Sequence, residues 1–569
     1  MMKKILFIIP LFALLFSCSD ILDIAPTNII SEDAVKNDPV LVDAYLNKIY
    51  ANVRFQSGGE GHANLGVTGG EQNVFAGWQT PYNVAMDIMD ENGAHSGLDY
   101  WPYGNIRSCN EIMEILQEAT FDPDEVTQKV AEARWLRAFM YFELVKRYGG
   151  VPLITEAQSI DQPIEELYVE RNSEKEIYDF IASEMDDLVT ILPESYGSDN
   201  FGRPTKWAAY ALKSRAMLYA GSIAKYGMQQ LNGLLGFSSG EADSYYQKAY
   251  DASMAVINGG MHPLYREDPD PETNYHNLFI TDGNSEVIFA EVYDYGLLKG
   301  HGWTFYCMPD GFQTGWGSNH WMYLESWEKY EYNDGTSAVW DRSMLDGNHK
   351  FSLDEIILNK DPRFLANAFY PETPWGDGKV YVHNKTIGTI PDGSDWPSVA
   401  PRRNRIKAGV LLKKRVNESL IGLYNGEDDS DWIVFRTGEM YLNAAEAKFE
   451  MGKADEAKPL INEIRNRAGM PDKETLTVED IRNERFVELY NEEHRYWDIR
   501  RWRIAVEELN GKGFNGVTWE YYIEEGMYTL KIKDADFGNI RTFTERNYYF
   551  PMGLGRLADN PNLVENPGY

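Results

Sequence analysis

The feature that most constrains the fold of this chain is a double helical pattern between Gly438 and Gly469. In its first half, apolar side chains recur every four residues until Gly452 interrupts the pattern, at Tyr441, Ala445 and Phe449. In its second half, they have the spacing of an amphipathic helix that stops at Gly469 and Pro471: Ala457, Leu460, Ile461, Ile464 and Ala468. The sequence therefore predicts two consecutive helices that pack against each other.

Similar helical pairs recur along the chain. We expect further pairs over 131–148 and 173–192, over 205–222 and 242–257, and over 40–53 and 105–119. Ser173 and Glu176 have the spacing of a capping box, which supports a helix start there. Stacked helix pairs bury a continuous core. The expected fold is therefore mainly α, with four helix pairs as a scaffold whose last member resembles a tetratricopeptide repeat.

Two stretches lack helical spacing and are rich in Gly, Pro, Asp and aromatic residues, about 56–103 and about 261–430. We expect long loops and short strands in both. Because binding residues often lie on loops that a rigid scaffold holds, we also expect the two stretches to meet over the helices and to form a ligand-binding region.

The first eighteen residues resemble a bacterial export signal. Two lysines precede an apolar run from Ile5 to Phe16 that is too short to span a bilayer, and Cys18 follows. This placement resembles a lipobox, which implies that residues 1–17 are removed and that Cys18 is acylated. The alternative is an ordinary signal peptide with an incidental cysteine. We favour acylation, because the chain has only 3 cysteines.

Charge restricts the partners of the body that remains, residues 18–569. The whole chain has 54 Lys and Arg against 88 Asp and Glu, which gives a formal net charge of −34. Such a surface repels phosphate backbones and anionic headgroups, so we expect no nucleic-acid partner and membrane contact through the lipid anchor only. Whether Cys109 and Cys307 pair is left open by the sequence.

A dense charged segment late in the chain admits two interpretations. Its carboxylates would suit the paired acids of a glycosidase, but its helical register places an apolar stripe on one face and favours structural ion pairs. We favour the ion pairs. The charged residues are Glu484, Arg485, Glu488, Glu493, His494, Arg495, Asp498, Arg500 and Arg501.

No other catalytic signature occurs in the sequence: it has no His-Glu-x-x-His, no Gly-x-Ser-x-Gly and no phosphate-binding loop. The acidic run 427–431 has oxygen ligands that suit calcium, yet it lacks the spacing and the glycine of an EF-hand. We interpret it as a solvated acidic turn. The sequence thus predicts a protein that is not an enzyme and has no cofactor or metal.

Aromatic residues in the loop-rich stretches are the candidates for ligand binding, because sugar rings pack their C–H faces on indole. They are Trp78, Tyr82, Trp101, Tyr103, Trp303, Trp316, Trp321 and Trp327. Polar groups that would orient a ligand are Asp90, Asn92, Asn319 and Arg403. Trp101 has binding and packing interpretations of equal weight, whereas Trp316 and Trp321 are expected to be exposed. These three tryptophans are the first candidates.

Four blocks of the sequence together resemble the SusD/RagB family of outer-membrane lipoproteins. A Leu-Asp then Pro pattern follows Cys18, residues 133–153 are similar to the family's second helix and turn, and residues 436–502 to its late helices. Phe550-Pro551 and the Asn-Pro pairs before Tyr569 resemble its terminal signature. Met552 to Gly555 departs from the family pattern, which has another proline there.

The resemblance implies four tetratricopeptide-like units, a loop-rich ligand face and a SusC-like TonB-dependent transporter as partner, over which the protein closes as a lid. It implies an oligosaccharide ligand, or a peptide, at the cell surface. The chain then divides into an N-terminal part (about 18–230), a loop-rich middle (about 261–430) and a C-terminal helical part (about 431–569). A surface glycoside hydrolase and a purely structural adaptor are the alternatives.

Overall fold

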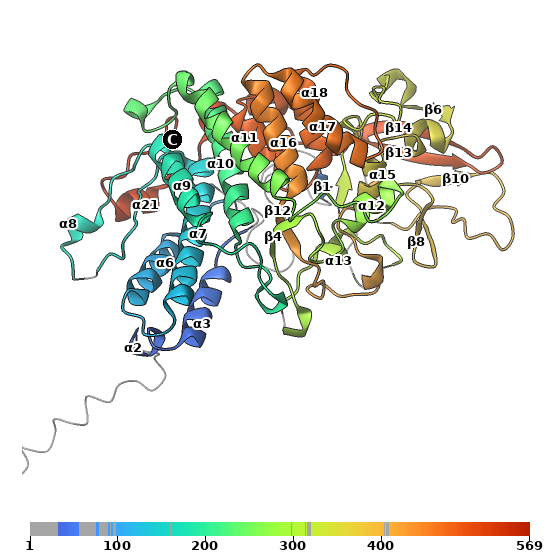
Figure 1. Cartoon of the computed structure of the whole chain (residues 1–569). Helices are drawn as coiled ribbons and strands as arrows, with labels where there is room; N and C mark the ends of the chain where they lie inside the picture. Colours follow the sequence, from blue (N-terminus) through green and yellow to red (C-terminus); the bar gives the residue numbers. More distant parts are fainter. Residues whose placement is uncertain are drawn as a thin grey trace, which may run out of the picture.

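The computed structural model describes residues 32–55, 76–78, 89–90, 93–94, 98–159, 161–297, 299–312, 315, 320–402, 404–405, 409–536 and 538–569. The fold is mainly α, as predicted, and short strands accompany the helices (Figure 1). The longer helices are α3 (Pro39–Tyr50), α6 (Tyr103–Leu116), α7 (Pro123–Tyr148), α9 (Glu174–Leu188), α10 (Lys206–Tyr226), α11 (Ala242–Gly259), α16 (Thr437–Glu450), α17 (Ala454–Arg467) and α18 (Val478–Glu488).

Shorter helices connect or follow this set. They are α2 (Glu32–Val35), α8 (Ile164–Leu167), α12 (Pro271–Asn277), α13 (Trp303–Cys307), α14 (Leu324–Trp327), α15 (Pro362–Asn367), α19 (Arg495–Arg501), α20 (Ala505–Leu509) and α21 (Leu554–Asp559). Within the described part of the chain, no helix has both the length and the apolar character needed to cross a membrane.

The long helices pack in chain order. α3 contacts α6, and the contacts continue through α7, α9, α10 and α11 to α16 and α17. Helices are present in all four predicted pairs, and the pair α16–α17 ends two residues before Gly469, as the Gly/Pro stop indicates. Their resemblance to tetratricopeptide repeats stays a prediction.

Local sequence explains several helix starts. The predicted capping box at α9 is present, because Ser173 and Glu176 bond each other's backbone N–H groups. Asp122 caps α7 and is followed by Pro123 at the first helical position, where a missing N–H costs no hydrogen bond. Thr477 caps α18 in the same way as Ser173 caps α9.

A glycine allows α10 and α11 to approach closely. A Cβ atom at Gly221 would lie 2.7 Å from ring atoms of Tyr246 on α11. Since real Cβ atoms do not come this near, only glycine fits here unless the helices separate.

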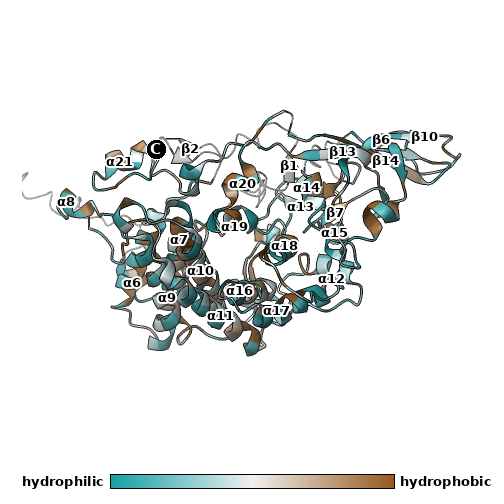
Figure 2. Ribbon diagram, turned by 90° about the horizontal axis from the view of Figure 1, so that it is seen from above, coloured by the Kyte–Doolittle hydropathy of each residue, from teal (hydrophilic) through white to brown (hydrophobic). Residues whose placement is uncertain are grey.

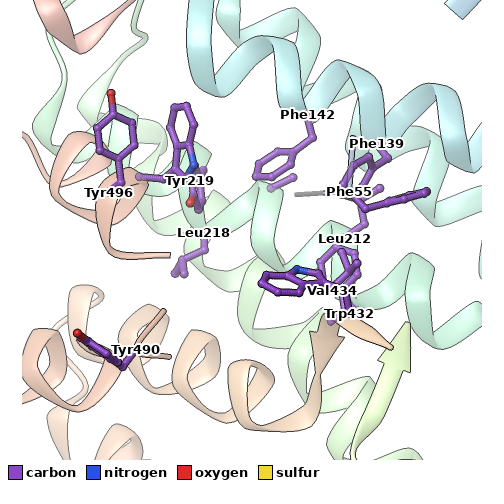
Figure 3. Close-up of a cluster of buried hydrophobic side chains, with 14 of the residues drawn as sticks. Phe55, Phe139, Phe142, Leu212, Leu218, Tyr219, Trp432, Val434, Tyr490 and Tyr496 are labelled. Atoms are coloured by element: carbon purple, nitrogen blue, oxygen red, sulfur yellow. The ribbon is translucent and has the colours of Figure 1, made fainter. Parts of the chain in front are cut away.

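The main core lies where α7 and α10 meet β12 (Trp432–Arg436). Figure 3 shows its aromatic side chains converging from these elements. Phe142 of α7 meets Tyr219 of α10 edge-on, with ring centroids 5.2 Å apart. The ring centroids of Phe55 and Phe139 lie 5.1 Å apart. Aromatic burial of this kind stabilises the scaffold over a wide contact area.

Short strands of the loop-rich middle pair with each other and with strands from other parts of the chain. One sheet has the order β1 (Ala76–Trp78), β5 (His320–Met322), β11 (Leu411–Leu412) and β7 (Ala368–Phe369). A second has the order β10 (Lys385–Ile387), β13 (Asn515–Tyr522), β14 (Met527–Asp534) and β6 (Asp346–Phe351). Two-stranded pairs complete the set: β4 (Val287–Glu291) with β12, β2 (Met89–Asp90) with β3 (Gly93–Ala94), and β8 (Thr373–Trp375) with β9 (Gly378–Val380).

The loop-rich middle is an insertion into the helical scaffold. The chain leaves at the end of α11 and returns to α16, and these two helices pack directly on each other. Seen from above, α6, α9, α11 and α17 lie along one edge of the molecule, and β1, β13 and β6 lie along the opposite edge (Figure 2). The molecule therefore has a helical side and a side of strands and loops.

Candidate functional site

Two segments far apart in the chain join in one small sheet, which we call the junction sheet (β1, β5, β11 and β7). β1 runs antiparallel to β5, with Trp78 opposite His320. β5 pairs in turn with β11, where Leu411 lies opposite Trp321. Because β1 comes from the first loop-rich stretch and the other strands from the second, the prediction that the two stretches meet is confirmed.

Trp101 lies half-buried just before α6. Side chains from three segments of the chain surround its ring. Its ring centroid is 4.9 Å from that of Tyr103 and 5.1 Å from that of Tyr148, which meets it edge-on. The guanidinium carbon of Arg556 on α21 lies 4.5 Å from the Trp101 ring centroid. Tyr103 donates a hydrogen bond of 2.6 Å to the Pro152 carbonyl oxygen. Trp101 and Tyr103 are thus brought together.

Polar groups lie next to the Trp101 ring. Arg556 Nη2 and Tyr148 Oη each donate to a different Asp99 oxygen, both at 2.5 Å. Burial raises the pKa of Tyr148 above its usual range, so its hydroxyl remains a donor. Sequence reasoning missed Asp99 and Arg556 as site residues, because no local spacing links positions 457 residues apart.

Trp321 is 0% exposed, so the prediction that it is exposed is wrong. It lies in β5, an interior strand of the junction sheet, and its side chain belongs to the main core. Trp303 and Trp327 are buried as well. Their indole N–H groups donate to the backbone carbonyls of Lys414 at 2.8 Å and Met322 at 3.2 Å. These three tryptophans belong to the main core.

Other candidates lie outside the described residues, and their roles stay predictions: Tyr82, Asn92, Trp316, Asn319 and Arg403, together with the signal segment and Cys18. The structure describes only the backbone at Trp78 in β1 and at Asp90 in β2.

The acidic run 427–431 is not a solvated turn throughout, which corrects our interpretation. Asp428 is 2% exposed and accepts hydrogen bonds from the backbone N–H groups of Thr304 and Ser430, both at 3.0 Å. Burial raises the pKa of Asp431 to about 7. Within the described ranges, no three acidic, His or Cys side chains are grouped to hold a metal ion.

The late charged segment forms buried ion pairs, as predicted. Glu488 on α18 contacts Arg436 at 2.7 Å, Arg363 at 3.0 Å and also Arg467. Glu484, one turn earlier, binds Arg363 at 2.6 Å. Carboxylates enclosed by guanidinium groups cannot face a scissile bond, so these residues do not have the open geometry of a glycosidase pair.

A second group of ion pairs joins α18 and α19 to α16. Arg485 and Arg501 both contact Asp498 and Glu446, with Arg501 Nε 2.9 Å from Asp498 Oδ1. Arg500 differs from the expectation, since its guanidinium packs on four aromatic rings and has no carboxylate partner in the described part of the chain. The segment therefore holds the C-terminal helices together.

Comparisons with known proteins agree with these observations. A family model described as "SusD family" matches residues 285–569, and one described as "Starch-binding associating with outer membrane" matches residues 21–218. Two relatives have similar lengths. A SusD-like protein of Bacteroides ovatus is 25% identical over 94% of this chain and 88% of its own. The starch-binding protein SusD of Bacteroides thetaiotaomicron is 24% identical over 97% of this chain and 96% of its own.

A solved structure has the same fold over most of this chain. It is a SusD-like protein from Bacteroides fragilis, with a TM-score of 0.75 and 26% identity over 96% of this chain and 100% of that one. The two family models together match most of the helical scaffold and most of the strand-rich side. This chain belongs to the SusD family.

Proposed function

We propose that this chain is a surface lipoprotein that binds an oligosaccharide and passes it to a SusC-like TonB-dependent transporter, over which it closes as a lid. The junction sheet carries the proposal, because it holds two loop-rich stretches together on a rigid scaffold, the usual arrangement for binding loops. The names of one relative and of one family model refer to starch binding, which supports a carbohydrate ligand.

The binding chemistry proposed here uses aromatic stacking and polar orientation. Trp101 presents a half-buried ring, and Asp99 and Arg556 place an acceptor and a donor beside it. Trp316 would add a second ring. The remaining candidates are Trp78, Tyr82, Tyr103, Asp90, Asn92, Asn319 and Arg403. Trp321 is left out of this set because it is buried.

The anchor in this proposal is Cys18, acylated after removal of residues 1–17. A family model whose description refers to the outer membrane begins its match at residue 21, close behind this cysteine, which supports that location. Two acyl chains would hold the body at the surface, where a lid must remain beside its transporter. The division into parts of about 18–230, 261–430 and 431–569 is proposed with it.

A peptide ligand is the alternative within the same family, and hydrolysis of a glycan is the alternative from another class. The burial of Glu484 and Glu488 in ion pairs disfavours hydrolysis by this segment. A glycan array that includes peptides, probed with mature protein carrying Cys18→Ala, tests the proposal. We expect saturable binding to one class of glycan and no product release. Binding to peptides alone, or release of sugars by the purified protein, would contradict it.

A further inference from the structure

An apolar groove runs along the helical side of the molecule, between α6 and α7. We call it the α6–α7 groove, and its cavity volume is about 580 Å³. Four half-buried apolar side chains line it: Met113, Val126, Val130 and Ile191. Each packs on the core with one side and leaves apolar surface in the groove. Polar residues line the groove as well, but apolar surface that is open in a groove commonly marks a contact with another segment.

A buried cation adds a polar feature to the same groove. Arg137 lines the cavity and is only 5% exposed. Its Nη1 donates to Asn110 Oδ1 at 2.8 Å, and its Nη2 donates to Glu184 at 3.2 Å. Its Nε is buried and has no hydrogen-bond partner among the described residues. Buried N–H groups are normally paired. The groove therefore suits an apolar segment that also carries an acceptor.

The chain enters the described structure beside this groove. α2 begins at Glu32, and the residues after it are fixed to the end of α6: Lys36 Nζ lies 3.1 Å from a Glu118 oxygen, and Thr120 N donates to the Lys36 carbonyl at 3.2 Å. Leu116, which lines the groove, is two residues before Glu118. The segment that precedes Glu32 therefore starts near one end of the groove.

We propose that residues 19–31 bind in the α6–α7 groove. This segment is rich in large apolar side chains: Ile21, Leu22, Ile24, Ile29 and Ile30. Asp23 supplies a carboxylate for Arg137, and Pro26 favours an extended backbone at the residue before it. The apolar side chains of the segment thus match the apolar lining of the groove, and Asp23 can serve as the acceptor for Arg137 beside its existing partner Glu184.

Length is also sufficient. Thirteen extended residues reach about 43 Å, whereas the part of α7 from Val126 to Arg137 is only about 17 Å long. The segment can therefore fill the groove and still have residues left at both ends. With residues 19–31 bound, the distance between Cys18 and the body becomes fixed and short. This consequence rests on the proposed acylation of Cys18, whereas the binding itself does not.

Disulfide crosslinking in unlipidated mature protein carrying Cys18→Ala tests the inference separately from the proposed function. One variant adds Ile24→Cys and Val130→Cys. Its matched control adds Ile24→Cys and Gln128→Cys, since Gln128 is exposed on the same helix two residues away. Cys109 and Cys307 are buried and unpaired, so they do not compete. We expect the first pair to oxidise at least tenfold faster within one chain, measured by mass spectrometry.

Equal rates in the two pairs, with both proteins folded by circular dichroism, would overturn the proposal. So would crosslinks between chains, because a second copy would then occupy the groove. An independent measurement uses a dansyl group on Ile24→Cys, whose emission we expect to be blue-shifted. Adding Val130→Asp should remove this shift, whereas adding Gln128→Asp should leave it. A shift that persists with Val130→Asp would also overturn the proposal.

Discussion

Glu488 accepts a hydrogen bond of 2.7 Å from Arg436, and both side chains are withdrawn from solvent, at 0% and 2% exposure. The pair joins α18 to the end of β12, which leads directly into α16. Arg436 also binds Glu286 at 2.8 Å, just before β4. One charged centre thus fixes the late helices to the strand pair through which the loop-rich middle returns to the scaffold.

Glu488→Gln should destabilise the protein without removing its ligand site. Three arginines would lose a shared charge in a buried setting, and breaking such pairs costs about 3–5 kcal/mol. Urea unfolding checks this. Glu479→Gln, at an exposed position of α18, is the control and should change the free energy of unfolding by less than about 0.5 kcal/mol. Glu484→Gln should also lower stability while folded protein keeps its affinity.

Acid should destabilise the fold through the same ion pairs. Burial alone would raise the pKa of Glu492, but Arg436 and Lys414 outweigh it and lower this pKa to about 2, against 4.5 for the unfolded chain. Since the folded pKa is the lower one, the stabilisation is complete above about pH 4.5 and is lost as the pH falls toward 2.

Glu492 alone should contribute on the order of 3 kcal/mol over this window. Unfolding in urea between pH 7 and pH 3 measures the larger part of this loss, which is complete only near pH 2. Glu492→Gln should be less stable at pH 7 and should show a shallower dependence on pH. A variant that loses stability as steeply as the parent protein would contradict the assignment.

Gly221→Ala should separate α10 from α11. The new Cβ would lie 2.7 Å from the Tyr246 ring, and overpacking of this kind costs about 1–3 kcal/mol. Gly104→Ala in α6 is the matched control, because a Cβ there meets nothing within 4 Å. We expect thermal unfolding to shift downward for Gly221→Ala only. Equal melting temperatures would show that the helices adjust without cost.

Trp101→Ala should lower the affinity for the best glycan found on the array at least tenfold, as judged by calorimetry. Arg556→Ala should have a smaller effect in the same direction, because it removes a group that lies over the ring and holds Asp99. Trp396→Ala is the control, because this half-buried tryptophan stacks on Tyr521 of β13, in the sheet that does not contain β1. Affinity that is unchanged in folded Trp101→Ala would exclude this residue from the site.

Cys18→Ala should separate binding from uptake. The purified variant should bind glycan like the parent protein, because the residue lies in the proposed anchor and not in the binding region. Cells that carry it should take up the glycan poorly, since the lid would no longer be held at the membrane. Uptake of labelled glycan checks this, and normal uptake would contradict the lid proposal.

The helical scaffold was predictable because its signal is local. The periodic stripe from Ala457 to Ala468 and the capping box at Ser173 each depend on residues within a few turns, and the structure has helices at both places. The ion pairs of α18 were predictable for the same reason, because the helical register of Glu484 and Glu488 places both on one face.

The candidate site was less predictable because its contacts are distant in the chain. Trp321 stands among Gly and Asn residues, which suggests exposure, but pairing of β5 with β1 and β11 buries it. Local sequence carries no trace of such strand partners. The position of Arg556 over Trp101 depends equally on packing of the C-terminal helix, which no spacing near either residue reveals.

The direct packing of α11 on α16 has a consequence for how this kind of protein diversifies. Because the chain leaves and re-enters the scaffold at neighbouring points, the loop-rich middle resembles an inserted domain whose ends are already close together. The strands of this insertion that pair with β1, β13 and β14 must stay, but its exposed loops can change in length and sequence while α11 and α16 keep their contacts. Variation within this family can then collect in those loops, on a scaffold whose helices keep their places.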